Sequence, residues 1–195
     1  MISIEGNIGA GKTFLCDLLK ANDVKVSQEP VNEWKIGKIN ILDHFYKNPT
    51  KYAYVFQTLV LRTRVEQVRG MENCIIERSV QSDGLFGGLQ HSLGNMDDVE
   101  YASYLYQYEQ AIQDTPAITQ HIYIKTSIDV CIQRISKRNR GQENKISENY
   151  LRKLEMAHER WLNGLDNVLV LNGNADWTDP QSAKSVVSKV KRFIM

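Results

Sequence analysis

Residues 2–15 read ISIEGNIGAGKTFL, and this stretch decides the fold that we expect. A short β-branched run comes first, three glycines follow within six positions, and Lys12 and Thr13 come directly after them. The segment matches the pattern G-x-x-x-x-G-K-[ST], in which backbone N–H groups surround a polyphosphate at the positive end of a helix. The pattern therefore predicts a phosphate-binding loop formed by Gly6, Asn7, Ile8, Gly9, Ala10, Gly11, Lys12 and Thr13.

The loop also predicts how a nucleoside triphosphate would be held. Lys12 would neutralise charge on the β- and γ-phosphates, and the Thr13 hydroxyl would bind Mg²⁺. A glycine-rich turn could match the pattern by accident, but the preceding strand and the apolar helix that follows, with Leu15 and Leu19, favour the phosphate loop. The loop alone predicts a bound nucleotide and not a reaction.

Composition narrows the functional classes. A chain of 195 residues is expected to fold as one domain. Its net charge of +1 gives no general attraction to nucleic acid or to an anionic membrane. No apolar run is long enough to span a membrane, and no secretory signal is recognisable. Cys16, Cys74 and Cys131 lack metal-ligand spacing, so we expect buried thiols in a cytoplasmic protein.

Short β-branched runs alternate with helical periods along the chain. We expect further strands at residues 24–27, 73–76, 121–125 and 168–171. Helical patterns cover residues 52–69, 97–112, 128–135 and 147–165, and a last helix begins at residues 179–180. Such alternation predicts an α/β protein with a doubly wound parallel sheet flanked by helices. In these sheets ligands bind beyond the carboxyl ends of the strands.

Two carboxylates follow predicted strands and obey that rule. Glu29 comes after the second strand, and Glu77 with its neighbour Arg78 comes after the third. An acid beside a bound triphosphate can hold Mg²⁺ or accept a proton from an attacking hydroxyl. The alternative is that these are solvated charges at strand ends. Two such sites in a sheet with a phosphate loop favour the functional interpretation.

A basic cluster follows the fourth strand and its helix. Arg134, Arg138 and Arg140 precede a loop at residues 141–145. A lid that places arginines on the transferred phosphoryl group is one interpretation. A solvated helix end and a nucleic-acid patch are the alternatives. The small net charge and the lack of interleaved aromatic residues argue against nucleic acid.

Taken together, the motifs resemble the deoxyribonucleoside kinases. The chain contains, in the order of that family, IEGNIGAGKT, EPVNEW, FYKNP, FQT, ERSVQSD and RISKRNRGQENK followed by YLRKLEMAHERWL. The resemblance covers about residues 2–171. It implies a five-stranded parallel sheet of the P-loop type with a mobile lid at about residues 138–146, and a single kinase domain over residues 1–195. It also implies a homodimer and Mg²⁺-dependent transfer of phosphate from ATP, or another nucleoside triphosphate, to a deoxynucleoside 5′-hydroxyl.

The same resemblance assigns roles to individual positions. Glu29 matches the general base, Glu77 a Mg²⁺-associated acid, and Arg78 an arginine near phosphate and hydroxyl. Substrate-binding positions are matched as follows: Trp34 and Phe56 as aromatic walls, Gln57 as the amide that reads the base, and Tyr46 and Glu143 at the sugar 3′-hydroxyl. Arg134, Arg138 and Arg140 match the lid arginines, which bind ATP. Aromatic residues are more often plain core, so a structural role for Trp34 and Phe56 stays an alternative.

Two charged positions bear on the base. Arg64 and Asp83 match a pair found in the cytosine- and purine-selective members, and such a pair would favour a base with an exocyclic amine. We therefore expect deoxycytidine or purine deoxynucleosides as substrates. A thymidine-preferring enzyme is the alternative, and a salt bridge that leaves the base unread is another.

The chain also departs from the family pattern. Gly87 stands where the family often has an aromatic residue, with Phe86 beside it, Gly84 replaces an arginine, and Gln142 replaces an acid of the lid. These changes predict a wider pocket and broad specificity.

Two other functions were weighed. A thymidylate-type monophosphate kinase needs positive charge for the phosphate of its acceptor, and Glu29 argues against it. A regulatory GTP-binding switch needs a guanine-reading N-K-x-D block after a late strand. The nearest string, ENKIS at residues 143–147, lacks the aspartate and lies in the predicted lid.

Overall fold

The computed structural model describes all residues from 1 to 195. The strands are β1 Ile2–Glu5, β2 Val26–Ser27, β3 Lys35–Ile36, β4 Ile39–Asn40, β5 Ile75–Glu77, β6 Gln120–Lys125 and β7 Val168–Asn172. The α-helices are α1 Lys12–Lys20, α2 Ile41–Lys47, α3 Pro49–Val68, α4 Val80–Ser92, α5 Asp98–Asp114, α6 Ile128–Arg138, α7 Glu148–Leu162 and α8 Pro180–Ile194, and the 3₁₀ turns are η1 Val31–Trp34 and η2 Glu143–Lys145.

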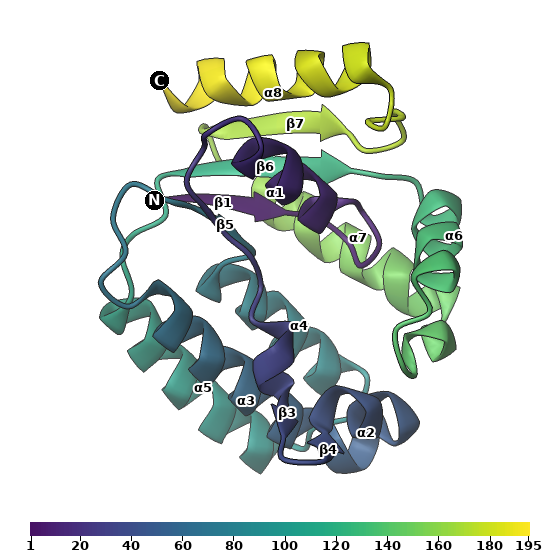
Figure 1. The fold of residues 1–195 in the computed structure, drawn as a ribbon. Coiled ribbons are helices and arrows are strands. Elements are labelled where there is room, and N and C mark those ends of the chain that lie inside the picture. The colour runs from purple at the N-terminus through teal and green to yellow at the C-terminus, as the bar shows by residue number, and fades with distance from the viewer.

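A five-stranded parallel sheet forms the centre of the molecule, in the order β2-β5-β1-β6-β7. The central strand β1 pairs with β5 through Ile2 and Ile75 and with β6 through Ile4 and Ile122. Figure 1 shows α8 beside the edge strand β7, and α3, α4 and α5 gathered on the opposite side of the molecule. The predicted doubly wound parallel α/β fold is confirmed.

The chain crosses from one half of the sheet to the other between β5 and β6, because these strands lie on opposite sides of β1. Beyond the carboxyl ends of adjacent strands at such a crossover, the connecting loops diverge and leave a crevice. The glycine loop follows β1, and Arg78 follows β5. The topology therefore brings these two segments to the same edge of the sheet.

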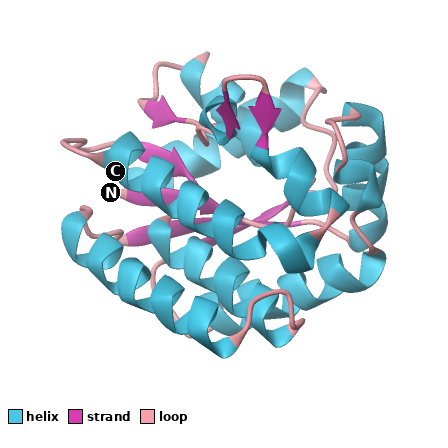
Figure 2. Ribbon diagram, turned by 90° about the horizontal axis from the view of Figure 1, so that it is seen from below, coloured by secondary structure: helices cyan, strands magenta, loops and turns pink.

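Three hydrophobic clusters hold the elements together. The largest surrounds the sheet and includes Ile4, Leu15 and Ile122, which are fully buried. A second, around Trp34 and Phe56, packs η1 and α2 against α3, and a third joins α3, α4 and α5. In Figure 2 the strands of the central sheet lie between helices. Burying these side chains supplies most of the favourable free energy of folding.

The local signals differ in how well they predict the elements. Asp97, Ser147 and Asp179 accept backbone N–H bonds as the N-caps of α5, α7 and α8, as expected at these helix starts. The second predicted strand is shorter than expected and covers only Val26–Ser27. Sequence patterns missed α2, which is only seven residues long, and α4, whose glycines weaken a helical pattern.

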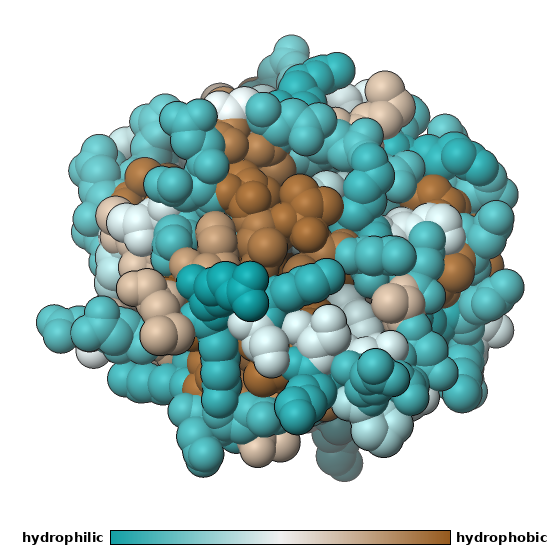
Figure 3. Space-filling model, turned by 90° about the horizontal axis from the view of Figure 1, so that it is seen from above, coloured by the Kyte–Doolittle hydropathy of each residue, from teal (hydrophilic) through white to brown (hydrophobic).

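The surface is mostly hydrophilic. Figure 3, which views the face that carries α8 in Figure 1, shows a large central hydrophobic patch and smaller hydrophobic areas among polar side chains. The three cysteines are buried and unpaired, as predicted. None of the helices combines the length and the apolar character that a membrane span requires.

Candidate active site

The glycine loop follows β1 and ends at the N-terminus of α1. Gly6, Gly9 and Gly11 have φ values of 145°, 78° and 103°, which side-chain-bearing residues rarely adopt. A Cβ on Gly6 would lie 2.7 Å from the Ile124 carbonyl oxygen, so the loop also needs glycine for space. No side chain caps α1, which leaves its first N–H groups free for an anion.

Lys12 is buried inside this loop. Its Nζ donates to the carbonyl oxygens of Asn7 at 2.8 Å and Gly6 at 3.2 Å. Burial, and then the nearby Arg78 guanidinium, lower the pKa of Lys12 to about 8. A polyphosphate in the loop would favour the charged form and raise this pKa again.

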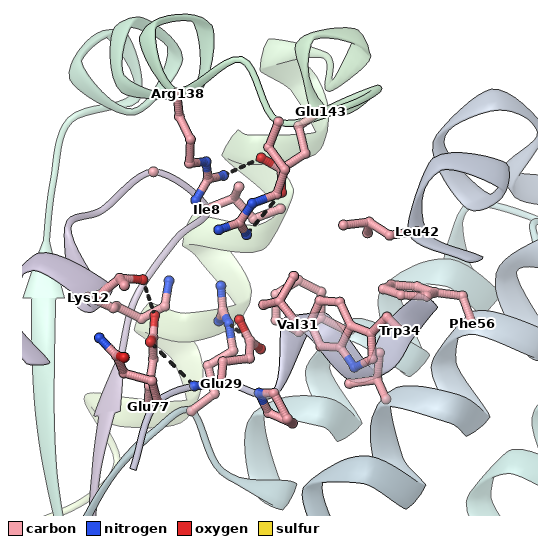
Figure 4. Close-up of a pocket in the computed structure, with 18 of the residues that line it drawn as sticks. Ile8, Lys12, Glu29, Val31, Trp34, Leu42, Phe56, Glu77, Arg138 and Glu143 are labelled. Atoms are coloured by element: carbon pink, nitrogen blue, oxygen red, sulfur yellow. Dashed lines mark hydrogen bonds and ion pairs between the residues drawn. The ribbon is translucent and has the colours of Figure 1, made fainter. Parts of the chain in front are cut away.

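A cavity of about 560 Å³ opens beyond the loop. Most of the predicted site residues line it: Ile8, Gly9, Gly11, Lys12, Thr13, Glu29, Trp34, Tyr46, Phe56, Gln57, Glu77, Arg78, Asp83, Arg134, Arg138, Arg140 and Glu143. Four predicted residues, Gly6, Asn7, Ala10 and Arg64, are not part of the lining. In Figure 4 the charged side chains, among them Lys12 and Glu77, lie on one side and Trp34 and Phe56 on the other.

Oxygen atoms suited to a magnesium ion meet beside the loop. The Thr13 hydroxyl donates to Glu77 Oε1 at 2.7 Å, and Glu77 Oε2 accepts from the Glu29 backbone N–H at 3.4 Å. Hydroxyl and carboxylate oxygens are the ligands that Mg²⁺ prefers, and the ion usually takes only one or two of them together with phosphates. No cluster of three or more His, Cys, Asp or Glu residues could hold a metal without a nucleotide. Thr13 and Glu77 therefore fit a magnesium ion that arrives with the nucleotide.

Glu29 lies between two guanidinium groups. Its Oε1 is 2.8 Å from Arg64 Nη2 and 3.4 Å from Arg78 Nε. Burial raises the pKa of Glu29, but Arg78, Arg64 and Lys12 outweigh burial and hold this pKa below its usual range. The carboxylate is thus ionised at neutral pH and can accept a proton.

Arg78 has a backbone conformation that is rare for a residue with a side chain. Its φ is 64°, and its N–H donates to the Ile4 carbonyl oxygen at 2.9 Å, which fixes the start of the turn. The guanidinium lies over the Phe86 ring at 4.7 Å. Its Nη1 is buried without a hydrogen-bond partner. A buried donor of this kind suits a phosphate or hydroxyl oxygen of a ligand.

Glu5 bonds to the residue that follows Arg78 and so helps to fix this turn. It is fully buried at the end of β1, and its Oε1 accepts from the Ser79 hydroxyl at 2.6 Å. Burial raises the pKa of Glu5. Ser79 caps α4 by accepting from the Ser82 N–H. The residue that follows Arg78 is therefore held from two directions.

Arg64 is fully buried and uses its donors on three residues. Nε and Nη2 donate to the two carboxylate oxygens of Asp83 at 2.8 and 3.1 Å, and Nη1 donates to the Glu77 carbonyl oxygen at 3.1 Å. Arg64 also donates to Glu29, so its guanidinium connects Asp83, which is predicted to influence base preference, with Glu29, the predicted general base. Asp83 lines the cavity, whereas Arg64 acts through its partners.

The apolar side of the cavity is built from three packed rings. Phe56 stacks on Phe45 with a centroid distance of 4.9 Å, and Trp34 meets Phe56 edge to face at 5.3 Å. Trp34 Nε1 donates to the Thr63 hydroxyl at 3.1 Å, which holds the indole in place. The nearby Gln57 amide makes no hydrogen bond to the protein and faces the cavity. This side of the cavity is apolar and carries one amide, that of Gln57, without a hydrogen-bond partner in the protein.

Gly87 does not widen the cavity, contrary to the prediction from its missing side chain. A Cβ there would overlap the ring of Tyr104, which comes from α5 and is fully buried. The Tyr104 hydroxyl donates to the Asp83 carbonyl oxygen at 2.7 Å. Phe86, one residue earlier, lines the cavity instead. The aromatic position is thus shifted by one residue.

The predicted lid and the end of α6 also contribute residues to the cavity lining. Arg138 forms an ion pair with the buried Glu143, and Arg140 Nη1 lies 3.8 Å from the same carboxylate. Arg134 Nη1 donates to the Ala10 carbonyl oxygen at 3.0 Å. Burial, followed by the nearby charges of Tyr150 and Glu143, raises the pKa of Tyr46. The lid therefore joins the phosphate loop to the side of the cavity that carries Tyr46.

Sequence patterns missed two aromatic residues of the site. Tyr150 lines the cavity, and its hydroxyl accepts from Gln90 Nε2 at 3.0 Å. Phe45 also lines the cavity. The motif FYKNP could have suggested Phe45, because it is the residue before Tyr46. Nothing in the sequence separates Tyr150 from an ordinary core residue.

The chain is similar in sequence to known proteins of one family. A family model described as deoxynucleoside kinase matches residues 2–195. A probable deoxycytidine kinase of fowlpox virus is 36% identical over 208 residues, covering 99% of this chain and 87% of the viral protein. Deoxycytidine kinase 2 of Gallus gallus is 30% identical, covering 99% and 89%. A putative kinase of invertebrate iridescent virus 3 is 33% identical, covering 89% and 88%.

Proposed function

This chain belongs to the deoxynucleoside kinase family, and we propose that it transfers the γ-phosphate of ATP to the 5′-hydroxyl of a deoxynucleoside. One observation carries the proposal. A carboxylate held ionised by two arginines, Glu29, lies in the same cavity as a glycine loop shaped for a polyphosphate. A hydroxyl placed between them would have a proton acceptor on one side and a phosphoryl donor on the other.

Glu29 removes the proton of the 5′-hydroxyl as the 5′-oxygen of the deoxynucleoside attacks the γ-phosphate. Negative charge then spreads over the phosphoryl oxygens and the leaving ADP. Lys12, Arg78 and the lid arginines stabilise that charge, and the free Nη1 of Arg78 is available for it. Thr13 and Glu77 would hold Mg²⁺, which would supply positive charge to the β- and γ-phosphates. The Phe56 and Trp34 rings and the Gln57 amide hold the base.

The proposed base carries an exocyclic amine. Gln57 offers a free carbonyl oxygen, and the Asp83 carboxylate lies at the same cavity wall. Both accept hydrogen bonds from an amino group. Relatives named deoxycytidine kinases point the same way. We propose deoxycytidine as the preferred substrate, followed by the purine deoxynucleosides, and thymidine as the poorest of the four.

The test is a steady-state assay of ADP release with ATP, Mg²⁺ and each of the four natural deoxynucleosides. ATP consumption should require a deoxynucleoside and stop when EDTA removes the metal. Phosphorylation of monophosphates but not of nucleosides would show a monophosphate kinase instead. Thymidine as the best substrate would refute the role given to Asp83 and Gln57.

Glu29→Gln tests the mechanism. It should lower kcat by about 10²- to 10⁴-fold, the usual contribution of a general base. Deoxynucleoside affinity should change little, because the amide oxygen can still accept from Arg64. Glu33→Gln is the matched control: Glu33 lines the same cavity, but it is exposed and, unlike Glu29, forms no ion pair with an arginine. Equal kcat values for the Glu29 variant and the wild type would remove Glu29 from the mechanism.

We further propose that residues 1–195 act as one kinase domain in a cytoplasmic homodimer. Val99 and Tyr106 on α5 are 79% and 68% exposed, and Val55 on the neighbouring α3 is 46% exposed. Large apolar side chains exposed on adjacent helices support an interface between copies. Three unpaired cysteines support a reducing compartment. Light scattering at several concentrations would test the dimer.

A further inference from the structure

Asp43 makes a contact that neither the motifs nor the proposed chemistry uses. It lies in the first turn of α2, where its backbone N–H donates to the side chain of the N-cap Asn40 at 3.3 Å. Its Oδ1 accepts from the backbone N–H of Gln142 at 3.1 Å. Asp43 is half-buried and forms no ion pair with a lysine or arginine. Its hydrogen bond to the lid is therefore its one interaction with a distant segment.

Gly141 shows how closely the lid approaches this carboxylate. Its φ is 48°, and a Cβ built on it would overlap Asp43 Oδ1. The other carboxylate oxygen lies 3.2 Å from the same point. A side chain at position 141 would displace the Asp43 carboxylate from its present position beside the lid. Glycine is needed here for its backbone conformation and for the space.

The contact joins two halves of the site that no other hydrogen bond connects. Helix α2 carries Phe45 and Tyr46 on the acceptor side of the cavity, and the lid carries Arg140 and Glu143. The bond from Gln142 to Asp43 is the only hydrogen bond recorded between α2 and residues 139–146. Arg134 is bonded to the Ala10 carbonyl oxygen of the phosphate loop, but Arg138 and Arg140 have ion pairs only with Glu143, which belongs to the lid itself.

We propose that Asp43 is a positioning residue that latches the lid onto α2 and so aligns the lid arginines with the phosphoryl group. The inference rests on the proposed function, because it concerns the step in which those arginines stabilise the transferred phosphate. Asp43 is not among the residues that line the cavity. It acts through the backbone of Gly141 and Gln142, which sets the course of the lid between Arg140 and Glu143.

Kinetics of Asp43 variants separate positioning from binding. Asp43→Ala removes the acceptor and should lower kcat about 10- to 100-fold, the range expected for a lost hydrogen bond to a charged group. ATP affinity measured by equilibrium binding should stay within about twofold, because the phosphate loop is intact. Asp43→Asn keeps an acceptor oxygen and should restore kcat to within a few-fold of wild type.

Gly141 supplies a second, steric test. Gly141→Ala should lower kcat more than Asp43→Ala does, because the new methyl group meets the carboxylate. In the double variant Asp43→Ala/Gly141→Ala the obstacle is gone, so kcat should rise at least tenfold above that of Gly141→Ala. Gly94→Ala is the matched control: its φ is 70° and a Cβ there meets nothing within 4 Å. It carries the same backbone strain and should keep the wild-type kcat.

Hydrogen exchange of the nucleotide-free protein tests the latch without activity. The Gln142 amide should exchange at least tenfold faster in Asp43→Ala than in wild type, while amides of β6 stay unchanged. Unchanged exchange at Gln142, or a double variant no faster than Gly141→Ala, would overturn the proposal. A wild-type enzyme inactive on all four deoxynucleosides would refute the proposed function instead, and exchange at Gln142 would then decide on the latch alone.

Discussion

Replacing Arg64 is the sharpest test of how this site is built, because one buried guanidinium serves two carboxylates. Arg64 is fully buried and donates to Asp83 at 2.8 and 3.1 Å and to Glu29 at 2.8 Å. Arg64→Met keeps an unbranched side chain but removes every one of these bonds. Asp83 would then be left as a buried carboxylate without a cation beside it.

The expected loss of stability follows from that isolated charge. Removing one partner of a buried ion pair costs about 3–5 kcal/mol of the free energy of unfolding. For a chain of this length each kcal/mol lowers Tm by about 2–4 °C, so Tm should fall by about 6–20 °C. Asp83→Asn in the same protein removes the orphaned charge. The double variant Arg64→Met/Asp83→Asn should therefore be more stable than Arg64→Met alone, although it carries one substitution more.

Chemical denaturation measures the three stabilities, and a pH profile supplies a second readout. The pKa of Glu29 lies below its usual range because Arg78, Arg64 and Lys12 outweigh the effect of burial. Without Arg64 this pKa rises, so the acidic limb of kcat/KM moves to higher pH. Two results would refute the reasoning. One is a double variant no more stable than Arg64→Met, and the other is an acidic limb that does not move.

Two further predictions concern the loop and α4. Burial and Arg78 lower the pKa of Lys12 to about 8 in the free protein, and only the protonated amine attracts phosphate. ATP affinity from equilibrium binding should therefore fall as pH rises above about 8, and constant affinity up to pH 9.5 would contradict this. Gly87→Ala should destabilise the protein by about 1–3 kcal/mol, because its methyl group would overlap Tyr104. Gly88→Ala meets only the Tyr101 hydroxyl at 3.4 Å and should stabilise α4 by up to about 1 kcal/mol; equal effects of these two variants in thermal unfolding would contradict the packing described here.

The sequence predicts those parts of the site that depend on local chain geometry. The glycine loop is contiguous, and its strand and helix follow directly in the chain, so its pattern specified the fold. Glu29 and Arg78 could be found because strand ends meet at one edge of a parallel sheet. The helical pattern that begins at residue 97 was also predicted, because helical periodicity depends on residues three and four positions apart.

Contacts between distant loops could not be predicted in this way. Asp43 and Gln142 are 99 positions apart, and nothing near either residue indicates the other. Gly87 shows a second limit. A missing side chain suggested empty space, but close packing lets a neighbouring helix fill it, and here Tyr104 does so. Predicting this would have required the relative placement of α4 and α5.

Six charged side chains at the site form one cluster, which cannot be divided into a catalytic group and a specificity group. The cluster contains three cations, Lys12, Arg64 and Arg78, and three carboxylates, Glu29, Glu77 and Asp83. Arg64 touches both Glu29 and Asp83, so a substitution at Asp83 that changes base preference also changes the surroundings of Glu29. Loss of Asp83 alone leaves Glu29 as the only carboxylate partner of Arg64. The Arg64 charge then stabilises the ionised form of Glu29 more strongly and lowers the pKa of Glu29 further. A weaker proton acceptor slows proton transfer. An enzyme altered at Asp83 should therefore lose kcat even with its best substrate, unless Arg64 is changed at the same time.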